Sequence, residues 1–184
     1  MAESPSLVEV RAQQGSDVIL RSATVDDIPA FRALGEAVVP PTYGPIDAAY
    51  AQRMLDEWWT PERFADTLPR VRMLVAERDG QVVAMSSFGR LSASHRAFPH
   101  VTGDREVMWK LYVHPDHHGL GIGSRLLAEV ESMVEGDELW LEVVDGNDRA
   151  YDFYVSRGFR EVERVTDRDW PDDIWLRKPL GGAQ

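Results

Sequence analysis

The chain of 184 residues contains no cysteine. Disulfide bonds, thiolate metal ligands and a cysteine nucleophile are therefore excluded. Long apolar runs are also missing, since no stretch approaches the ~20 residues that a membrane-spanning helix needs. The first residues, Met-Ala-Glu-Ser-Pro-Ser, lack the basic and apolar regions of a signal peptide. These absences predict a cytoplasmic protein with no membrane partner.

Positive charge is scarce as well. The formal net charge at pH 7 is −11, whereas a protein that binds nucleic acid presents a clustered basic surface. We therefore expect no nucleic-acid partner. The acidic surplus would suit a cationic small molecule or a basic peptide, or it serves only to keep the protein soluble.

The remaining composition is that of one globular domain. Apolar residues make up 43% of the chain and charged residues 28%, which is enough apolar material for a real core. Residues 1–16 are polar and aperiodic, so we expect a flexible N-terminal tail. A single domain is expected over residues 17–180, followed by a short tail at 181–184.

Hydrophobic periodicity predicts the order strand, two or three helices, three strands, helix, strand, helix, two strands, which is a mixed α/β sheet with helices on its faces. Pro40 and Pro41 are expected to break the first helix, residues 25–38. A second helix is expected over residues 47–59, and a short third helix follows Thr60 as N-cap. Asp79-Gly80 between two apolar runs predicts a tight hairpin.

A glycine-rich turn is the most informative local feature. An apolar strand ends at Val113, and glycines then alternate in Gly119-Leu-Gly-Ile-Gly123 before a helical pattern begins. Backbone N–H groups and the helix dipole at such a turn attract phosphate. The turn is not a dinucleotide fingerprint, because Ser124 stands where the third glycine should be, and no Gly-Lys-Ser/Thr P-loop occurs. We expect a phosphorylated ligand here.

The surroundings of this turn resemble the GNAT superfamily of N-acetyltransferases. The matching motifs are Leu111-Tyr-Val-His-Pro, His118-Gly-Leu-Gly-Ile-Gly123 and Asn147-x-x-Ala-x-x-Phe-Tyr-x-x-x-Gly-Phe159. The resemblance covers roughly residues 18–180 and implies a mostly antiparallel sheet of about six to seven strands with helices on both faces. It also implies acetyl-CoA as cosubstrate, a primary amine of a small molecule or peptide as acceptor, and a monomer or homodimer.

The resemblance further implies which residues hold acetyl-CoA. A splayed or bulged strand at Leu111–Val113 would pair with the pantetheine arm, the glycine turn would hold the pyrophosphate, and Tyr154 would hydrogen-bond and protonate the sulfur. Tyr154 could instead serve helix packing, and Asn147 could instead cap its own helix. The expected cofactor-binding residues are Leu111, Tyr112, Val113, His118, Gly119, Leu120, Gly121, Ile122, Gly123, Ser124, Arg125, Asn147, Tyr151 and Tyr154.

One departure from the family pattern concerns charge. His118 stands where relatives usually carry Arg or Gln, and a neutral imidazole supplies one hydrogen bond but less charge. We expect weaker cofactor binding, which Arg125 in the first turn of the following helix could offset.

The chemistry of transfer follows from what is missing. Without cysteine or a Gly-x-Ser-x-Gly elbow, the acyl group should pass directly from thioester to amine in a ternary complex. Glu106, which shares strand parity with Met108, Lys110 and Tyr112, and Glu142 on a neighbouring strand are the candidates for general base. Either carboxylate could equally be a solvated charge at a strand end.

An aromatic region and a histidine cluster complete the candidate residues. Tyr43 is the best candidate for a wall of the acceptor pocket, although aromatic residues in this region could also serve packing. Acceptor identity should depend on residues 40–59 and 92–104. The histidines His114, His117 and His118, with Asp116 nearby and His95 and His100 further upstream, invite a metal site. Solvated loop histidines explain them better, so no metal is expected.

A second function class remains open alongside the enzyme. A non-catalytic acyl-CoA-binding sensor or regulatory module would also keep the glycine turn. The presence of Tyr154 favours catalysis, whereas the departure at His118 leaves room for the sensor.

Overall fold

The computed structural model describes residues 17–91, 105–166 and 169–181. The expected N-terminal tail at 1–16, all but residue 181 of the expected tail at 181–184, and the polar connection at 92–104 lie outside the described residues.

A seven-stranded sheet forms the centre of the molecule, in the order β1-β2-β3-β4-β5-β7-β6. All neighbouring strands are antiparallel except β4 and β5, which are parallel. The strands are β1 (Val18–Ser22), β2 (Arg72–Arg78), β3 (Gln81–Arg90), β4 (Glu106–Val113), β5 (Glu138–Val144), β6 (Arg160–Val165) and β7 (Asp173–Pro179). The mixed, mostly antiparallel sheet is confirmed.

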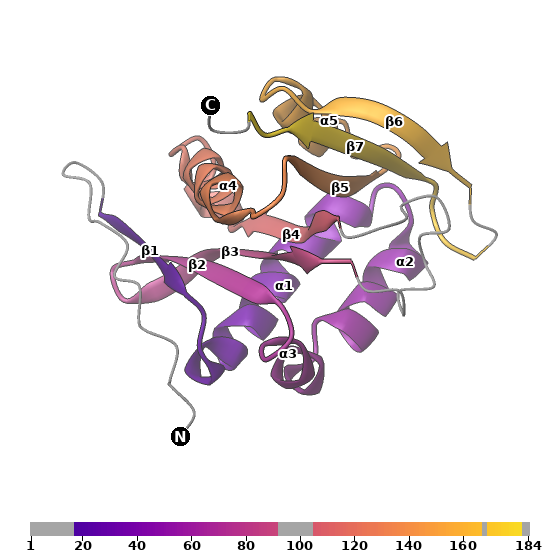
Figure 1. Cartoon of the computed structure of the whole chain (residues 1–184). Coiled ribbons are helices and arrows are strands. Elements are labelled where there is room, and N and C mark those ends of the chain that lie inside the picture. The colour runs from indigo at the N-terminus through magenta and orange to yellow at the C-terminus, as the bar shows by residue number, and fades with distance from the viewer. Residues whose placement is uncertain (1–16, 92–104, 167–168, 182–184) are drawn as a thin grey trace.

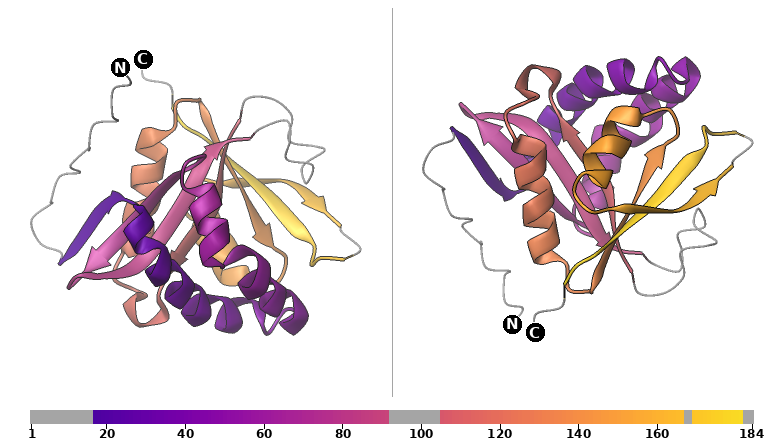
Figure 2. Two further views of the ribbon diagram at one scale, coloured as in Figure 1. Left: turned by 90° about the horizontal axis from the view of Figure 1, so that it is seen from below. Right: turned by 90° about the horizontal axis from the view of Figure 1, so that it is seen from above.

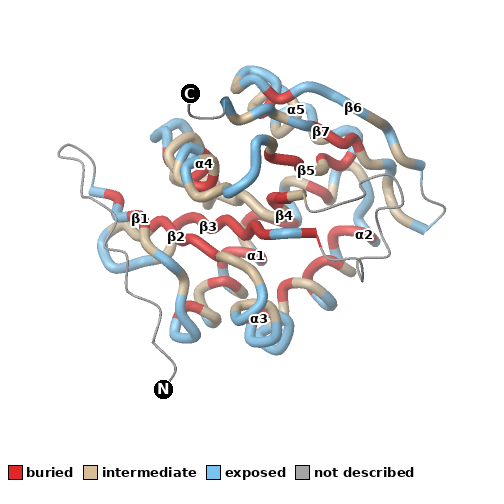
Figure 3. The backbone as a smooth tube through the Cα atoms, viewed as in Figure 1, coloured by how far each residue is buried: buried red, intermediate tan, exposed pale blue. Residues whose placement is uncertain are grey.

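Helices cover both faces of this sheet (Figures 1 and 2). On one face lie α1 (Ile28–Tyr43), α2 (Ala48–Arg53) and α3 (Pro61–Thr67), with a 3-10 turn Val25–Asp27 before α1 and a π-helical turn Met54–Trp58 after α2. The other face carries α4 (Ile122–Met133) and α5 (Asp148–Val155), with a 3-10 turn Pro115–His117 ahead of α4. Buried residues concentrate along the central strands and the inner sides of these helices (Figure 3).

Each face has its own apolar cluster because strand side chains alternate between the two sides. Leu126, Leu127 and Val130 of α4 pack on the central strands on one side. Phe31 of α1 and Trp59 pack in the cluster on the other side. The sheet is therefore held between two helical layers, as the periodicity predicted.

The first helix is longer than predicted. Pro40 and Pro41 were expected to end it near Val38, but α1 continues through both prolines to Tyr43. Each proline removes one backbone donor from the last turn, and the carbonyl of Pro40 still accepts from Gly44 N at 3.0 Å. Burial of the Tyr43 side chain beyond them offsets the cost of the prolines, which is about 3 kcal/mol for a helix interior.

Several local predictions are confirmed. Thr60 caps α3 by accepting from Arg63 N at 3.2 Å, and the helix expected over 47–59 appears as α2 and the turn Met54–Trp58, with Asp47 outside it as N-cap. Asp79 and Gly80 adopt φ values of 52° and 76°, which is the left-handed geometry of a tight hairpin turn.

The sheet opens between β4 and β5. These strands pair over only three positions, from Glu106 opposite Leu139 to Met108 opposite Leu141. Beyond Met108, β4 continues beside β3 alone, and β5 continues beside β7. The parallel pair therefore splits into a fork in the middle of the molecule.

A β-bulge lies where the fork begins. Ser87 pairs with Lys110 and Phe88 with Met108, which leaves Trp109 as the extra residue of β4. The bulge reverses the alternation of side chains, so Met108 packs on the α4 face whereas Tyr112 packs on the α1 face. The expectation that Glu106, Met108, Lys110 and Tyr112 share one face is therefore wrong.

Candidate active site

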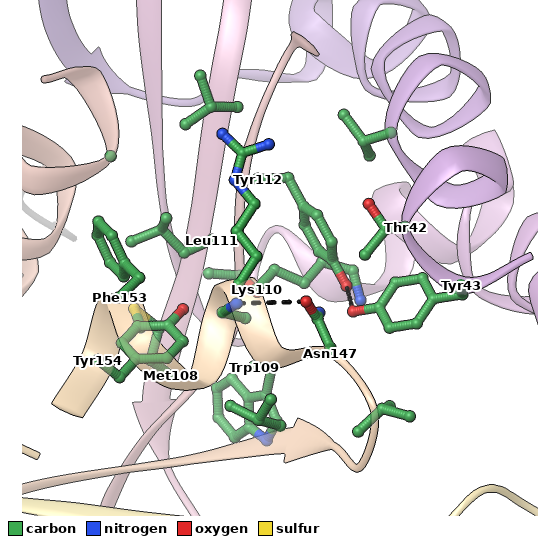
Figure 4. Close-up of a pocket in the computed structure, with 18 of the residues that line it drawn as sticks. Thr42, Tyr43, Met108, Trp109, Lys110, Leu111, Tyr112, Asn147, Phe153 and Tyr154 are labelled. Atoms are coloured by element: carbon green, nitrogen blue, oxygen red, sulfur yellow. Dashed lines mark hydrogen bonds between the residues drawn. The ribbon is translucent and has the colours of Figure 1, made fainter. Parts of the chain in front are cut away.

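A cavity of about 1200 Å³ occupies the fork between β4 and β5 (Figure 4). Its walls come from the ends of α1 and α2, from β4, from the glycine turn, and from β5 and α5. A volume above the ~300–1,000 Å³ of ordinary ligand pockets leaves room for two molecules at once. The cavity runs from the glycine turn, through the fork, to the aromatic side chains under α1 and α2.

The glycine turn forms one end of this cavity. Gly119 and Gly121 adopt φ values of 79° and 75°, which side-chain-bearing residues rarely take, and Gly121 is the N-cap of α4. A Cβ at Gly123 would lie 3.5 Å from Phe153, an ordinary contact distance, so the packing of α4 on α5 does not itself require glycine there. Of the residues expected to form the cradle, Gly119, Gly121, Ile122, Gly123 and Ser124 line the cavity. Leu120 does not line it and is 54% exposed.

The histidine at the mouth of the turn is held against the strand. His118 also lines the cavity, and its Nε2 lies 2.8 Å from the carbonyl oxygen of Val113. Burial lowers the pKa of His118, so the imidazole is neutral near pH 7. His118 therefore supplies little positive charge to an anion.

Two arginines of the α5 region supply that charge instead. Arg149 and Arg157 line the cavity, and Arg157 donates to Ser124 Oγ at 2.5 Å while lying over the Phe153 ring. Arg125, expected to compensate for His118, points toward β1 and does not line the cavity. Sequence reasoning missed Arg157 because nothing in its spacing shows that a residue at the end of α5 reaches the first turn of α4.

Arg125 donates to the carbonyl of Val18 at 3.1 Å. This contact ties α4 to the first strand and turns the guanidinium away from the glycine turn. The side chain helps to hold the sheet edge rather than the cavity mouth.

Tyr154 lies in the wall of the cavity on α5. Its ring contacts Phe153 and Phe159 at centroid distances of 5.1 and 5.5 Å, and burial raises the pKa of its hydroxyl. The phenol therefore stays protonated and can donate. Tyr151 faces away, toward β6, where its hydroxyl donates to Glu161 at 3.1 Å.

The position of Asn147 is compatible with both roles considered for it, capping of its own helix and contact with a ligand. Its side-chain oxygen caps α5 by accepting from Ala150 N at 3.3 Å, and the residue also lines the cavity. Figure 4 shows its amide beside the hydroxyl ends of Tyr43 and Tyr112. Capping and ligand contact are therefore compatible.

Tyr43 combines packing with a place in the cavity wall. It is buried at the end of α1, and its hydroxyl lies 2.8 Å from that of Tyr112 on β4. Burial raises the pKa of Tyr43 to about 12. Tyr50 and Trp58 continue this aromatic wall, with Tyr50 edge-on to Tyr43 at 5.6 Å.

A carboxylate and an amine face each other across the fork. Glu142 on β5 lines the cavity, and burial, with a further contribution from Asp173, raises the pKa of Glu142 to about 8. Lys110 on β4 also lines the cavity, and burial lowers the pKa of Lys110 to about 8. Each charge favours the ionised form of the other, so the two groups are coupled electrostatically across the fork.

Glu106, the other candidate for general base, lies outside the cavity. Glu106 is buried in an ion pair with Arg72, which also donates to the carbonyl of Met133 at the end of α4. Glu106 lies at the closed end of the fork and does not line the cavity. Its environment is that of a structural ion pair.

The histidines of the loop do not gather ligands in the part of the chain that the structure describes. His114 and His117 meet edge to face at 5.7 Å, but no group of three or more potential ligands forms among the described residues. His95 and His100 lie outside the described residues. Within the described ranges, no helix is both long and apolar enough to span a membrane.

Comparison with known proteins identifies the family of the chain. The sequence model of the acetyltransferase (GNAT) family matches residues 33–159. This chain belongs to the GNAT family. It is also 33% identical over 134 residues to the N-alpha-acetyltransferase RimI of Mycobacterium tuberculosis, covering 67% of this chain and 80% of that protein.

Solved GNAT structures share the fold over nearly their whole length. The PaiA N-acetyltransferase of Thermoplasma acidophilum, solved in complex with coenzyme A, has a TM-score of 0.72 at 19% identity and covers 88% of this chain and 98% of that one. The ribosomal-protein-alanine N-acetyltransferase of Brucella melitensis has a TM-score of 0.65 at 26% identity. The match covers 88% of this chain and 99% of that one. The chain is an N-acetyltransferase.

Proposed function

We propose that this GNAT protein transfers the acetyl group of acetyl-CoA to a primary amine by direct attack in a ternary complex. The observation that carries the proposal is one continuous cavity that joins the glycine turn to Glu142 and Tyr154. A cofactor entering from the turn and an acceptor entering from the aromatic side would meet in the fork. Two relatives named for acetylating protein N-termini favour a peptide α-amine, and the acidic surplus of the chain suits a cationic acceptor.

The pyrophosphate of acetyl-CoA would lie against the backbone N–H groups at the start of α4, within reach of Arg149 and Arg157. Beyond Met108, the edge of β4 that faces the fork has no strand partner there, so its backbone groups are available to the pantetheine arm. Leu111, Tyr112 and Val113 supply that edge.

Glu142 is the general base in this proposal. A carboxyl with a pKa of about 8 can take a proton from an ammonium group near neutral pH, and Glu142 lies in the fork where the amine would enter. The neutral amine then attacks the thioester carbonyl, and a backbone N–H of the β4 edge stabilises the oxyanion. Glu106 is committed to its ion pair with Arg72 outside the cavity, so it has no part in this step.

Tyr154 is the general acid. As the carbon–sulfur bond breaks, its hydroxyl protonates the leaving thiolate, which is already a moderate leaving group with a pKa near ~8.5 by analogy with cysteine. The raised pKa of Tyr154 keeps the proton on the phenol until the thiolate forms.

Isothermal titration with acetyl-CoA, combined with thiol release across a panel of peptides and small amines, tests the proposal. We expect binding and turnover, with turnover lost in Glu142→Gln while acetyl-CoA affinity is retained. Tight binding without turnover on any amine would favour the non-catalytic sensor. Absence of measurable binding would contradict both functions.

A further inference from the structure

The chain contains only two lysines, Lys110 and Lys178. Lys178 on β7 forms a 2.6 Å ion pair with Glu131 of α4 and lies 5.8 Å from the Phe159 ring centroid. It does not line the cavity. Lys110 is the only lysine that faces the place where acyl transfer is proposed.

The position of Lys110 follows from the bulge in β4. It is the first residue after Trp109, just beyond the last position at which β4 pairs with β5, and it points to the α1 side of the sheet. Its Nζ lies 5.8 Å from the Trp59 ring centroid. Within the described residues, no carboxylate lies within 4.0 Å of this Nζ, and Glu142 acts on it from a longer distance. The amine is therefore not held in a close ion pair of the kind that occupies Lys178.

The amine of Lys110 is also unusually reactive for a lysine. Burial lowers its pKa from 10.5 to about 8, so roughly one molecule in ten carries a neutral amine at pH 7, since each pKa unit is a tenfold change. An ordinary lysine is neutral in fewer than about one molecule in a thousand at that pH. A neutral amine is the form that attacks a thioester.

We propose that Lys110 is a self-acetylation site, modified by the acetyl thioester bound in the same cavity when no acceptor amine is present. This inference rests on the proposed function, because it uses the same bound acetyl-CoA. The neutral Nζ forms a bond to the carbonyl carbon, the carbon–sulfur bond breaks, and the electron pair leaves with the sulfur. The nitrogen loses one proton, which passes to the thiolate through Glu142, so the products are an acetamide on Lys110 and free coenzyme A. No oxidant or further reactant is needed.

Acetylation of Lys110 would change the site. The acetamide carries no charge, so the ionised form of Glu142 loses the cation that favours it. The added acetyl group also takes up part of the cavity that the acceptor would occupy. Self-acetylated enzyme should therefore turn over acceptor more slowly than unmodified enzyme.

The experiment uses the full chain incubated with acetyl-CoA labelled in the acetyl group, without acceptor, followed by peptide mass spectrometry of both lysines. Lys178 is the internal control for non-enzymatic acetylation. Lys110→Arg is the variant that removes the site, and an excess of any acceptor that the enzyme turns over is added in a parallel incubation. Acetyl-CoA binding is measured by calorimetry on the same samples.

We expect the label on Lys110 to appear at least about tenfold faster than on Lys178, to be suppressed by acceptor, and to be absent in Lys110→Arg. Binding of acetyl-CoA with equal labelling of the two lysines, or with none, would overturn self-acetylation and leave the proposed function in place. No binding of acetyl-CoA would overturn both. Labelling of Lys110 that persists unchanged in Glu142→Gln would overturn the proton route through Glu142.

Discussion

Replacement of Glu142 by glutamine should stabilise the fold at alkaline pH while it removes activity. Burial raises the pKa of Glu142 from 4.5 to about 8, so the folded protein retains a proton that the unfolded chain releases. Below pH 4.5 both states are protonated and the carboxyl contributes nothing to the pH dependence. As the pH rises from 4.5 to about 8, the free energy of unfolding falls. Above about pH 8 the carboxylate is ionised in both states, and the free energy of unfolding is lowered by the full cost of burying its charge.

The size of the effect follows from the same shift. One pKa unit corresponds to about 1.4 kcal/mol, so a shift from 4.5 to about 8 corresponds to roughly 5 kcal/mol at pH 9. Glu142 is partly exposed to the cavity, where solvent screens its charge, so we expect about half of that value. Lys110, with a pKa of about 8, is mostly neutral at pH 9, so the loss of its carboxylate partner costs little there.

Urea unfolding of the wild type and Glu142→Gln at pH 6 and pH 9 measures this difference. The stabilisation by Glu142→Gln should reach about 2 kcal/mol at pH 9 and should be smaller by about 1 kcal/mol or more at pH 6. Glu36→Gln is the matched control, because Glu36 is an exposed partner of Arg32 on α1, and it should change stability by less than about 0.5 kcal/mol at either pH. The reasoning is refuted if Glu142→Gln destabilises the protein at pH 9, or if its effect does not grow between the two pH values.

Three further substitutions separate the roles of other residues. Tyr154→Phe should lower kcat by about ten- to hundredfold with acetyl-CoA affinity nearly unchanged, and an unchanged kcat would remove Tyr154 from the mechanism. Arg157→Met should weaken acetyl-CoA binding by about tenfold in calorimetry, since a hydrogen bond to a charged group contributes about 1.5–3 kcal/mol, whereas Arg125→Met should leave that affinity within about twofold. Equal effects of the two arginine variants would contradict the assignment. Glu106→Gln should lower the free energy of unfolding by about 3 kcal/mol, because the Arg72 cation loses its carboxylate partner, and a neutral result in urea unfolding would argue against a structural ion pair.

Much of the fold could be predicted because the signals are local. Asp79-Gly80 determines its hairpin through left-handed φ values, and the cap at Thr60 satisfies donors only three residues away. The prediction failed at Pro40 and Pro41, where the local rule for proline is outweighed by burial of Tyr43 beyond them. That burial depends on strands that follow much later in the chain.

The candidate site also contains some residues that could be identified from the sequence and others that could not. The glycine turn could be located from sequence because its residue types and spacing are typical of a backbone anion site, whereas Tyr154 was singled out only through the resemblance of its motif to the GNAT family. The choice between Glu106 and Glu142 could not be made, since both are carboxylates on neighbouring strands. The arginine that reaches the turn could not be identified either, because Arg125 is close in sequence and Arg157 is close only in space.

The sequence by itself determined the order of elements and the glycine-rich turn ahead of α4, because each depends on residues within about one turn or one strand of each other. The reaction class followed from motifs that resemble the GNAT family. The family resemblance implied a splayed or bulged strand at Leu111–Val113, but only the tertiary structure located the bulge at Trp109 and the opening of the sheet just beyond Met108. A single extra residue, Trp109, shifts the register of β4 and turns Lys110 and Tyr112 to the α1 side of the sheet, whereas Glu106 lies before the bulge in an ion pair with Arg72. Such a bulge results from the pairing of two strands and has no signature within either strand alone.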